Sequence, residues 1–238
     1  MRALITGATR GIGRAITEKV LHRLTEVTIL ARDERALDHT RDWILQEKPD
    51  CAVEIISADQ ADLEKFAELL RGWREKDGAT RPLDFVVLNA GTYTEGDLAE
   101  IPIRDYRRDL DINLNAHLVA VQELLPSLRL GERRRLFVIG STAAYEAYPL
   151  VPSYGIAKAG LRALATNLRV ELRTENIGVS FISPGGTLTD MWAGEDLPEG
   201  RLLEPSDIGT LVDACLSLSS QAVVEQLIVV PMEGDIHE

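Results

Sequence analysis

The stretch RALITGATRGIGRAI, residues 2–16, joins a short apolar run to a glycine-rich turn and then to an amphipathic segment. Residues 2–6 predict a buried strand, and three glycines follow it at Gly7, Gly11 and Gly13. Glycine allows the backbone to approach a pyrophosphate closely, and the first turn of a helix offers free N–H groups and the positive end of its dipole. A strand, this turn and a helix in that order are the context that a dinucleotide-binding site requires. A tight strand-to-helix turn without a ligand is the simpler alternative.

The rest of the chain continues the same alternation of short apolar runs and longer helical patterns. Strands that are apolar almost throughout and alternate with helices are typical of a parallel sheet covered on both faces. We therefore expect a single-domain α/β fold of the Rossmann type, a doubly wound sheet of seven parallel strands with helices on both faces. The expected strands are residues 2–6, 26–31, 52–57, 83–89, 135–141, 178–184 and 225–231.

The charge and composition of the chain exclude several classes of protein. Its 238 residues carry a formal net charge of -12, and an acidic chain is a poor partner for nucleic acid because phosphates need neutralising. Two distant cysteines and four scattered histidines offer no disulfide framework and no metal-ligand spacing. No stretch approaches the roughly 18 apolar residues of a membrane span, and no signal peptide precedes the first strand. We expect a soluble cytoplasmic protein with no metal, no membrane contact and no nucleic-acid partner.

One tyrosine and one lysine stand four residues apart in VPSYGIAKAGLRA, residues 151–163. On a helix, Tyr154 and Lys158 share a face. A phenol is a weak acid at neutral pH, and a fixed cation close to it would stabilise the phenolate and lower the pKa. Such a tyrosine can protonate a carbonyl oxygen while hydride reaches the carbon. Taken alone, this spacing has surface packing as its commoner explanation.

The spacing of the glycine turn, G-x-x-x-G-x-G after a threonine, resembles the short-chain dehydrogenase/reductase family. Other motifs of that family follow in order, and the resemblance extends from residue 2 to about residue 231. It implies hydride transfer between a nicotinamide cofactor and a carbonyl or alcohol, chemistry that belongs to the cofactor while the protein positions and tunes. It assigns residues 1–90 mainly to cofactor binding and residues 91–238 to catalysis and substrate binding.

The resemblance also implies a role for each of four catalytic positions. Tyr154 would be the acid/base, and Lys158 would bind the ribose hydroxyls and tune the tyrosine. Ser141, which ends the fifth expected strand, would hold the substrate carbonyl. Asn113, in the motif DINLN, would kink the helix that follows and anchor a proton-relay water. Each has a structural alternative, because Ser141 could cap a helix and Asn113 could satisfy one.

The end of the second strand, LARDE, indicates which form of the cofactor is preferred. Arg32 stands where NAD-preferring members of the family carry Asp, and Arg10 in the glycine turn can point to the same place. Two guanidinium groups suit a 2′-phosphate, so we expect NADP(H). The alternative is that both arginines pair with nearby carboxylates such as Asp33 and Glu34.

The resemblance extends the expected cofactor contacts along the chain. Asp59 matches the position that bonds the adenine, with a place near a helix N-cap as its alternative. The motif PGGTLT, residues 184–189, would lie beside the nicotinamide and its carboxamide. The expected cofactor-binding residues are Gly7, Thr9, Arg10, Gly11, Ile12, Gly13, Arg32, Asp59, Asn89, Ala90, Gly91, Tyr154, Lys158, Pro184, Gly185, Thr187 and Thr189.

Three variable segments would set the substrate: residues 92–101, residues 145–152 and an expected mobile lid at 187–204. Their aromatic and apolar side chains could line a pocket in which a flat ring such as a pterin stacks. Trp192 pinning the lid in place is an equal alternative. The expected substrate-binding residues are Tyr93, Tyr148, Met191 and Trp192.

Departures from the commoner family pattern leave the substrate open. The chain has GSTAAY and LNAG in place of the usual motifs, and its ending VVEQLIVVPMEGDIHE resembles the bacterial sepiapterin reductase branch of the family. We expect an NADPH-dependent reductase of a small-molecule carbonyl, with sepiapterin reduction and 3-oxoacyl-carrier-protein reduction as alternatives. An NAD-dependent alcohol dehydrogenase and a non-enzymatic NADP-sensing protein are further alternatives. In the family, long helices pack against a second subunit, so a homodimer or homotetramer is expected.

Overall fold

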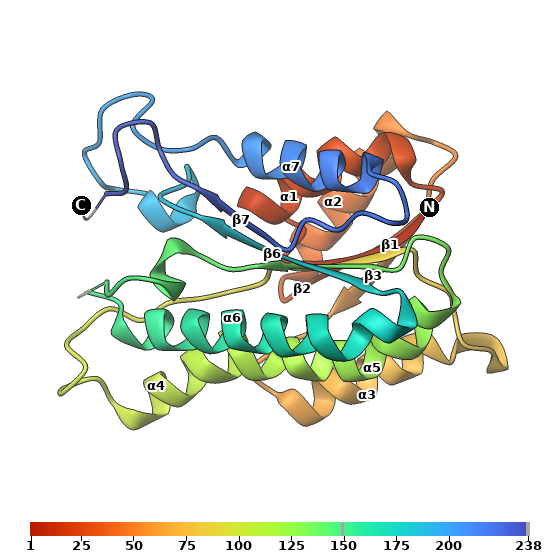
Figure 1. Ribbon diagram of the computed structural model, residues 1–238, viewed down its shortest axis with the longest axis horizontal. Helices are drawn as coiled ribbons and strands as arrows, with labels where there is room; N and C mark the ends of the chain where they lie inside the picture. The colour runs from red at the N-terminus through yellow and green to blue at the C-terminus, as the bar shows by residue number, and fades with distance from the viewer. Residues whose placement is uncertain (149, 237–238) are drawn as a thin grey trace.

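In the computed structural model, which describes residues 1–148 and 150–236, seven parallel strands form one sheet in the order β3-β2-β1-β4-β5-β6-β7 (Figure 1). The order reverses between β1 and β4, where the chain crosses from one half of the sheet to the other. The expected doubly wound parallel sheet is therefore confirmed. The strands are β1 Arg2–Thr6, β2 Glu26–Ala31, β3 Ala52–Ser57, β4 Phe85–Leu88, β5 Arg135–Ile139, β6 Gly178–Pro184 and β7 Gln226–Val229.

Helices cover both faces of the sheet and bury two separate apolar clusters against it (Figure 1). One face carries α1 Gly11–Val20, α2 Glu34–Glu47 and α7 Pro205–Ser217. The other carries α3 Leu63–Arg74, α4 Ile103–Leu110, α5 Ala116–Leu130 and α6 Pro152–Leu172. Central strands such as β5 and β6 are buried along their whole length because both of their faces are covered, which accounts for their continuous apolar sequence.

Three strands end earlier than the sequence predicts. The expected ranges 83–89, 135–141 and 225–231 contract to β4, β5 and β7. In the first case the chain leaves the sheet at Asn89, because its side chain bonds the backbone of the neighbouring β1 rather than pointing across the sheet. Asn89 after β4 and Ser141 after β5 therefore lie outside the strands, in the loops that follow them.

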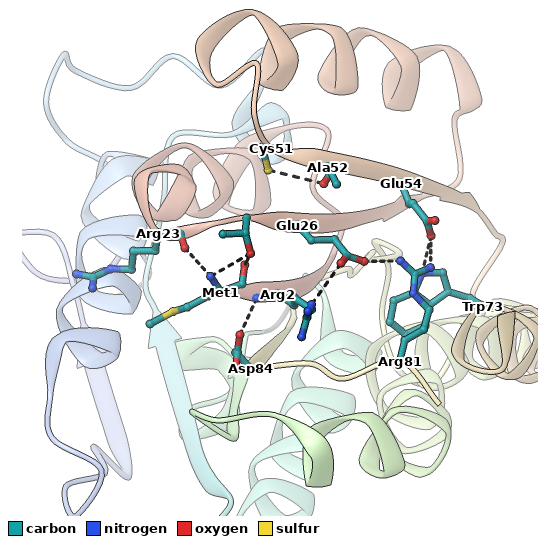
Figure 2. Close-up of polar contacts among 11 residues, drawn as sticks. Met1, Arg2, Arg23, Glu26, Cys51, Ala52, Glu54, Trp73, Arg81 and Asp84 are labelled. Carbon is teal, nitrogen blue, oxygen red and sulfur yellow. Dashed lines mark hydrogen bonds and ion pairs between the residues drawn. The ribbon is translucent and has the colours of Figure 1, made fainter. Parts of the chain in front are cut away.

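Near the amino ends of β2 and β3, at the end of the sheet opposite the site, charged residues form a cluster (Figure 2). Arg81, in the connection after α3, bonds the carboxylates of both Glu26 and Glu54 and lies over the ring of Trp73 at 4.8 Å. The indole of Trp73 donates to Glu54 at 3.0 Å. Burial acts to raise the pKa of Glu54, but hydrogen bonds from Arg81 and Lys76 outweigh it, so the pKa lies below its ordinary value. One arginine therefore ties β2, β3 and α3 together.

Replacing Arg81 with Met should lower the free energy of unfolding by about 2 kcal/mol, because two half-buried carboxylates lose a charged partner while the alkyl packing on Trp73 is kept. Urea denaturation at neutral pH measures this. Arg104→Met is the matched control, since Arg104 makes an exposed ion pair with Asp105 and should contribute little. Equal losses in the two variants would contradict the assigned role.

Candidate active site

In the turn between β1 and α1, Gly7 and Gly13 stand where a side chain would not fit. Gly7 and Gly11 have φ values of +64° and +51°, a region that favours glycine. A Cβ on Gly13 would lie 2.1 Å from the carbonyl oxygen of Gly7, so α1 packs directly on the turn. A Cβ on Gly11 would lie 3.0 Å from Thr189, which brings the start of segment 187–204 against the same turn.

The N-terminus of α1 is suited to an anion. Its N-cap residue, Arg10, makes no side-chain capping bond, and no acidic residue lies in the first turn. The free N–H groups and the helix dipole therefore favour a negatively charged group such as a pyrophosphate. Thr9 and Ile12, also expected to contact a cofactor, flank this position and are half-buried.

The two arginines expected at a 2′-phosphate are both exposed. Arg10 pairs with Asp190 of segment 187–204 at 2.6 Å. Arg32 has no ion pair among residues 1–148 and 150–236. The neighbouring Asp33 is occupied as the N-cap of α2, where it accepts from the backbone N–H of Ala36 at 3.1 Å. Arg32 and Asp33 therefore form no ion pair in this structure.

Asp59 lies beyond the end of β3 and is exposed. Its carboxylate accepts from the backbone N–H of Ala61 at 3.0 Å and lies 3.8 Å from the guanidinium of Arg108. The N-cap of α3 is Asp62, three residues later. Asp59 therefore shapes the turn before the helix and leaves its edge open to a ligand.

Tyr154 and Lys158 share one face near the start of α6, and Ser141 faces them from the end of β5. The ammonium of Lys158 is 5.4 Å from the centre of the Tyr154 ring and donates to the carbonyl of Ile139 at 3.2 Å. Lys158 is only 3% exposed, and burial lowers its pKa to about 8. At neutral pH it still carries its charge.

The expected lowering of the Tyr154 pKa is wrong for this geometry. Burial raises the pKa of the phenol, and its hydrogen bond with Ser141 opposes that shift only in part. Lys158 donates its hydrogen bond to the carbonyl of Ile139 in β5 rather than to the phenol oxygen. The phenol is consequently a proton donor at neutral pH.

Asn113 is fully buried in a single π-helical turn, Asp111–Asn115, inserted between α4 and α5. Its side-chain amide donates to the carbonyls of Thr92 and Asp109, and its side-chain oxygen accepts from the backbone N–H of Thr92. A Cβ on Gly91 would lie 2.8 Å from that oxygen and 3.7 Å from the ammonium of Lys158. Asn113 thus joins the end of β4 to the Lys158 side of the site. Inserted π-turns of this kind are frequent at functional sites.

Asn89 and Ala90 complete the floor of the site. The Thr6 hydroxyl accepts from the backbone N–H groups of both residues at 2.9 and 3.1 Å. Pro184 is buried at the end of β6, Gly185 follows it, and Thr187 begins segment 187–204. Every expected cofactor residue from the glycine turn, β4 and β6 therefore lies at the carboxyl ends of the strands, where open α/β sheets bind ligands.

The expected substrate residues divide into two groups. The hydroxyl of Tyr93 donates to the carbonyl of Met191 at 3.3 Å, which brings segments 92–101 and 187–204 together. Trp192, in the short helix Asp190–Trp192, is half-buried beside Met191. Tyr148 instead turns its hydroxyl to Asp235 at 2.5 Å. Pro149, within the expected segment 145–152, lies outside the described residues.

Two buried carboxylates near the site were not predicted from the sequence. Asp109 accepts from Ser153, the residue before Tyr154, at 2.5 Å and from the backbone and hydroxyl of Thr94. Asp235 bonds the residue that follows Ser141. Asp109 does lie four residues before Asn113, but the charged pattern of α4 around it predicts a solvated helix and conceals its burial.

A sequence model described as short chain dehydrogenase matches residues 1–199. The chain belongs to this family. Among its relatives is a sepiapterin reductase of Chlorobaculum tepidum, 28% identical over 241 residues that cover 99% of this chain and 98% of the relative. An alcohol dehydrogenase from the archaeon Thermococcus sibiricus, complexed with 5-hydroxy-NADP, has a TM-score of 0.84 at 25% identity, covering 97% of this chain and 96% of that one. A short chain dehydrogenase from Burkholderia cenocepacia in complex with NADP has a TM-score of 0.85 at 26% identity, with the same coverage of 97% and 96%.

As a short chain dehydrogenase the protein is an oxidoreductase. Across residues 1–148 and 150–236, no three His, Cys, Asp or Glu side chains are grouped so that they could hold a metal ion. Over the same residues, no helix has both the length and the apolar character needed to cross a membrane.

His117 is a buried titratable group on the Lys158 side of this short chain dehydrogenase site. Burial first, and the charge of Lys158 second, lower its pKa to about 3, and the backbone of Ile112 offsets this only slightly. Neither ring nitrogen of His117 has a hydrogen-bond partner among the residues that the structure describes. His117 is consequently neutral in the folded protein at every pH at which the fold is expected to persist.

Stability should fall as the pH drops below about 6.5, because the unfolded chain then protonates His117 and the folded one does not. This residue alone should remove about 2 kcal/mol of unfolding free energy between pH 6.5 and pH 5. Urea denaturation of the wild type and of His117→Leu across that range measures the difference, which the variant should lose. The exposed His39→Leu is the control and should follow the wild type. Parallel curves for wild type and His117→Leu would contradict the assignment.

Proposed function

We propose that the protein reduces a carbonyl group of a small molecule to an alcohol with NADPH. The observation that carries the proposal is the grouping of Ser141, Tyr154 and the charged Lys158 at the carboxyl ends of the central strands, with the Lys158 ammonium 5.4 Å from the centre of the Tyr154 ring. This group stands at the same edge of the sheet as the glycine turn.

The chain's own residues provide what carbonyl reduction requires besides hydride. Tyr154 keeps its proton at neutral pH, so the proton that the carbonyl oxygen takes up as hydride reaches the carbon is in place. Ser141 donates a second hydrogen bond to the same oxygen and orients it. Lys158, fixed on the carbonyl of Ile139, keeps a positive charge near the oxygen as negative charge develops there. NADPH, when bound, supplies the hydride.

The glycine turn and the arginines fit NADPH. Gly7 and Gly13 leave no space for a Cβ, Gly11 has a left-handed φ, the α1 N-terminus is free for the pyrophosphate, and Arg32 is exposed while Asp33 caps α2. Two structural relatives, 25% and 26% identical in sequence, are complexes with 5-hydroxy-NADP and with NADP, which supports the choice of NADPH. An NAD-dependent alcohol dehydrogenase is the less favoured alternative, since Arg32 directly follows β2 and the neighbouring Asp33 serves as the N-cap of α2.

Tyr154→Phe should lower kcat/KM for any active carbonyl substrate by about 100-fold or more, because the proton donor is lost while the ring packing is kept. Steady-state oxidation of NADPH measures this. The Kd for NADPH should stay within about threefold of the wild-type value, which is a change in binding free energy of less than about 1.4 kcal/mol. Tyr106→Phe on α4 is the matched control. Unchanged turnover in Tyr154→Phe would refute the mechanism.

Arg32→Ala should weaken NADPH binding by about tenfold and leave NADH binding unchanged, since one charged hydrogen bond to a phosphate contributes roughly 1.5 kcal/mol. Fluorescence titration with both cofactors gives the two Kd values. Arg41→Ala is the control, because Arg41 lies on α2, shortly after Arg32 in the chain, and already pairs with Asp38 and Asp42. Equal weakening of NADPH and NADH in Arg32→Ala would argue against a 2′-phosphate site.

Sepiapterin, a pterin side-chain ketone, is the substrate class with a specific observation in its favour. The Chlorobaculum tepidum relative matches nearly the whole chain, and Tyr93, Met191 and Trp192 lie together where a flat ring could stack. Comparison of sepiapterin, an acetoacetyl thioester and simple diketones as substrates separates this from 3-oxoacyl reduction and general carbonyl reduction. Tight NADPH binding without turnover of any of them would favour a non-enzymatic NADP-sensing protein.

We further propose that segment 187–204 closes over the substrate and that the protein forms a homodimer or homotetramer. The base of this segment is joined by backbone hydrogen bonds between Gly186, Leu188 and Leu203, which leaves the intervening residues as one loop. The outer face of α6 exposes Ile156 and Val170, which supports contact with a second subunit. A cytoplasmic location remains an expectation of the same proposal.

A further inference from the structure

Asp235, in the segment after β7, is 4% exposed and accepts hydrogen bonds from several parts of the chain. The Thr142 hydroxyl donates to its carboxylate at 2.6 Å, and the Tyr148 hydroxyl donates to the same oxygen at 2.5 Å. Its other oxygen accepts from the backbone N–H of Gly186 at 2.9 Å and from that of Ile236 at 3.0 Å. Both oxygens of one carboxylate are therefore used, by residues far apart in the sequence.

Two of these partners adjoin the proposed catalytic groups. Thr142 follows Ser141 directly, in the short helix Thr142–Ala144 that the Ser141 side chain caps. Gly186 follows the turn at the end of β6, and a Cβ on Gly185 would lie 2.9 Å from the Asp235 carboxylate. The carboxylate therefore fills the space between the loop after β5 and the loop after β6.

Segment 187–204 is joined to the same point. The guanidinium of Arg201 donates to the carbonyls of Gly234 and Asp235 at 2.9 and 3.0 Å. Figure 1 shows the chain after β7 returning to the side of the molecule where that segment lies. A displacement of Asp235 would consequently release both loops and the far end of the segment.

The charge of Asp235 suits this arrangement. Burial acts to raise the pKa of its carboxyl, but the hydrogen bonds from Thr142, Tyr148, Gly186 and Ile236 together outweigh burial and lower it. Burial and the nearby carboxylate raise the pKa of Tyr148, which stays a donor. An asparagine could offer only one acceptor oxygen, and its NH₂ group would face a donor that the carboxylate now satisfies.

We propose that Asp235 is a positioning residue for the reaction, whose carboxylate fixes the Ser141 loop relative to the Pro184–Gly186 loop. The proposal rests on the proposed carbonyl reduction, in which Ser141 holds the substrate oxygen while the loop after β6 lies beside the nicotinamide. The distance between the two loops then sets how closely the carbonyl carbon approaches the hydride. Rate is steep in that distance, since a misplacement of about 1 Å can cost roughly 100-fold.

Steady-state kinetics of Asp235→Asn test this proposal. We expect kcat to fall by about 10- to 100-fold. NADPH binding should stay within about threefold, because the glycine turn is untouched, and KM should change less than kcat. The deuterium isotope effect on kcat with 4-deuterated NADPH should rise, as hydride transfer becomes slower than the other steps. Glu233→Gln makes the same chemical change two residues away and should match the wild type, because the Glu233 side chain is exposed and its 3.8 Å ion pair with Arg201 contributes little. Wild-type kcat in Asp235→Asn, or a fall in kcat matched by the same fall in NADPH binding, would overturn the proposal.

Hydrogen exchange provides a readout that does not depend on activity. In Asp235→Asn, peptides covering residues 141–148 and 184–203 should both exchange faster than in wild type and in Glu233→Gln, while residues 1–90 should be unchanged. Faster exchange confined to residues 231–236 would refute the proposal that Asp235 fixes the two loops. If Asp235→Asn does not fold, Thr142→Val and Tyr148→Phe remove one donor each and should loosen the same two segments. A wild type without turnover on any carbonyl would refute the proposed function, and the exchange result would still decide whether Asp235 braces the loops.

Discussion

The hydrogen bonds between the ends of β1 and β4 are the constraint on which the site depends. Thr6 accepts from the backbone of Asn89 and Ala90, and the Asn89 amide donates to the carbonyls of Thr6 and Gly7. These bonds satisfy backbone groups where both strands leave the sheet. They also hold Gly7 in its left-handed conformation under α1, so that the helix N-terminus points at the crevice where the strand order reverses. A looser junction would leave the glycines without a fixed surface to offer a phosphate.

The same solution recurs at the other strand ends. The chain beyond β4 is tied by Asn113 and Asp109, and the chains beyond β5 and β6 are tied by Asp235. Loops contain backbone N–H and C=O groups that cannot be buried without partners, and apolar packing cannot supply those partners. Buried carboxylates and amides supply them here, each bonding several donors at once. Polar residues thus hold the site in place, while the two apolar clusters hold the sheet.

The sequence predicted the sheet more completely than the site. The bounds of β1, β2 and β6 follow from their apolar runs because burial on both faces leaves little choice of residue, and the half-buried edge strand β3 also matches its predicted range. The motifs also located Ser141, Tyr154 and Lys158 at one edge. Asp109 and Asp235 escaped notice, since an acidic residue among charged neighbours predicts a solvated surface. The pairing of Arg10 with Asp190, 180 residues apart, and the raised pKa of Tyr154 depend on tertiary distances and burial that no local pattern contains.

The position of Asp235 makes the sheet and the site depend on different parts of the chain. Asp235 follows β7, so all seven strands, Tyr154 and Lys158 precede it in the sequence. A chain cut directly after β7 would keep every strand of the sheet. It would lack the carboxylate that joins the loops after β5 and β6. Residues outside every strand and helix are therefore as much a part of the site as those that build the sheet.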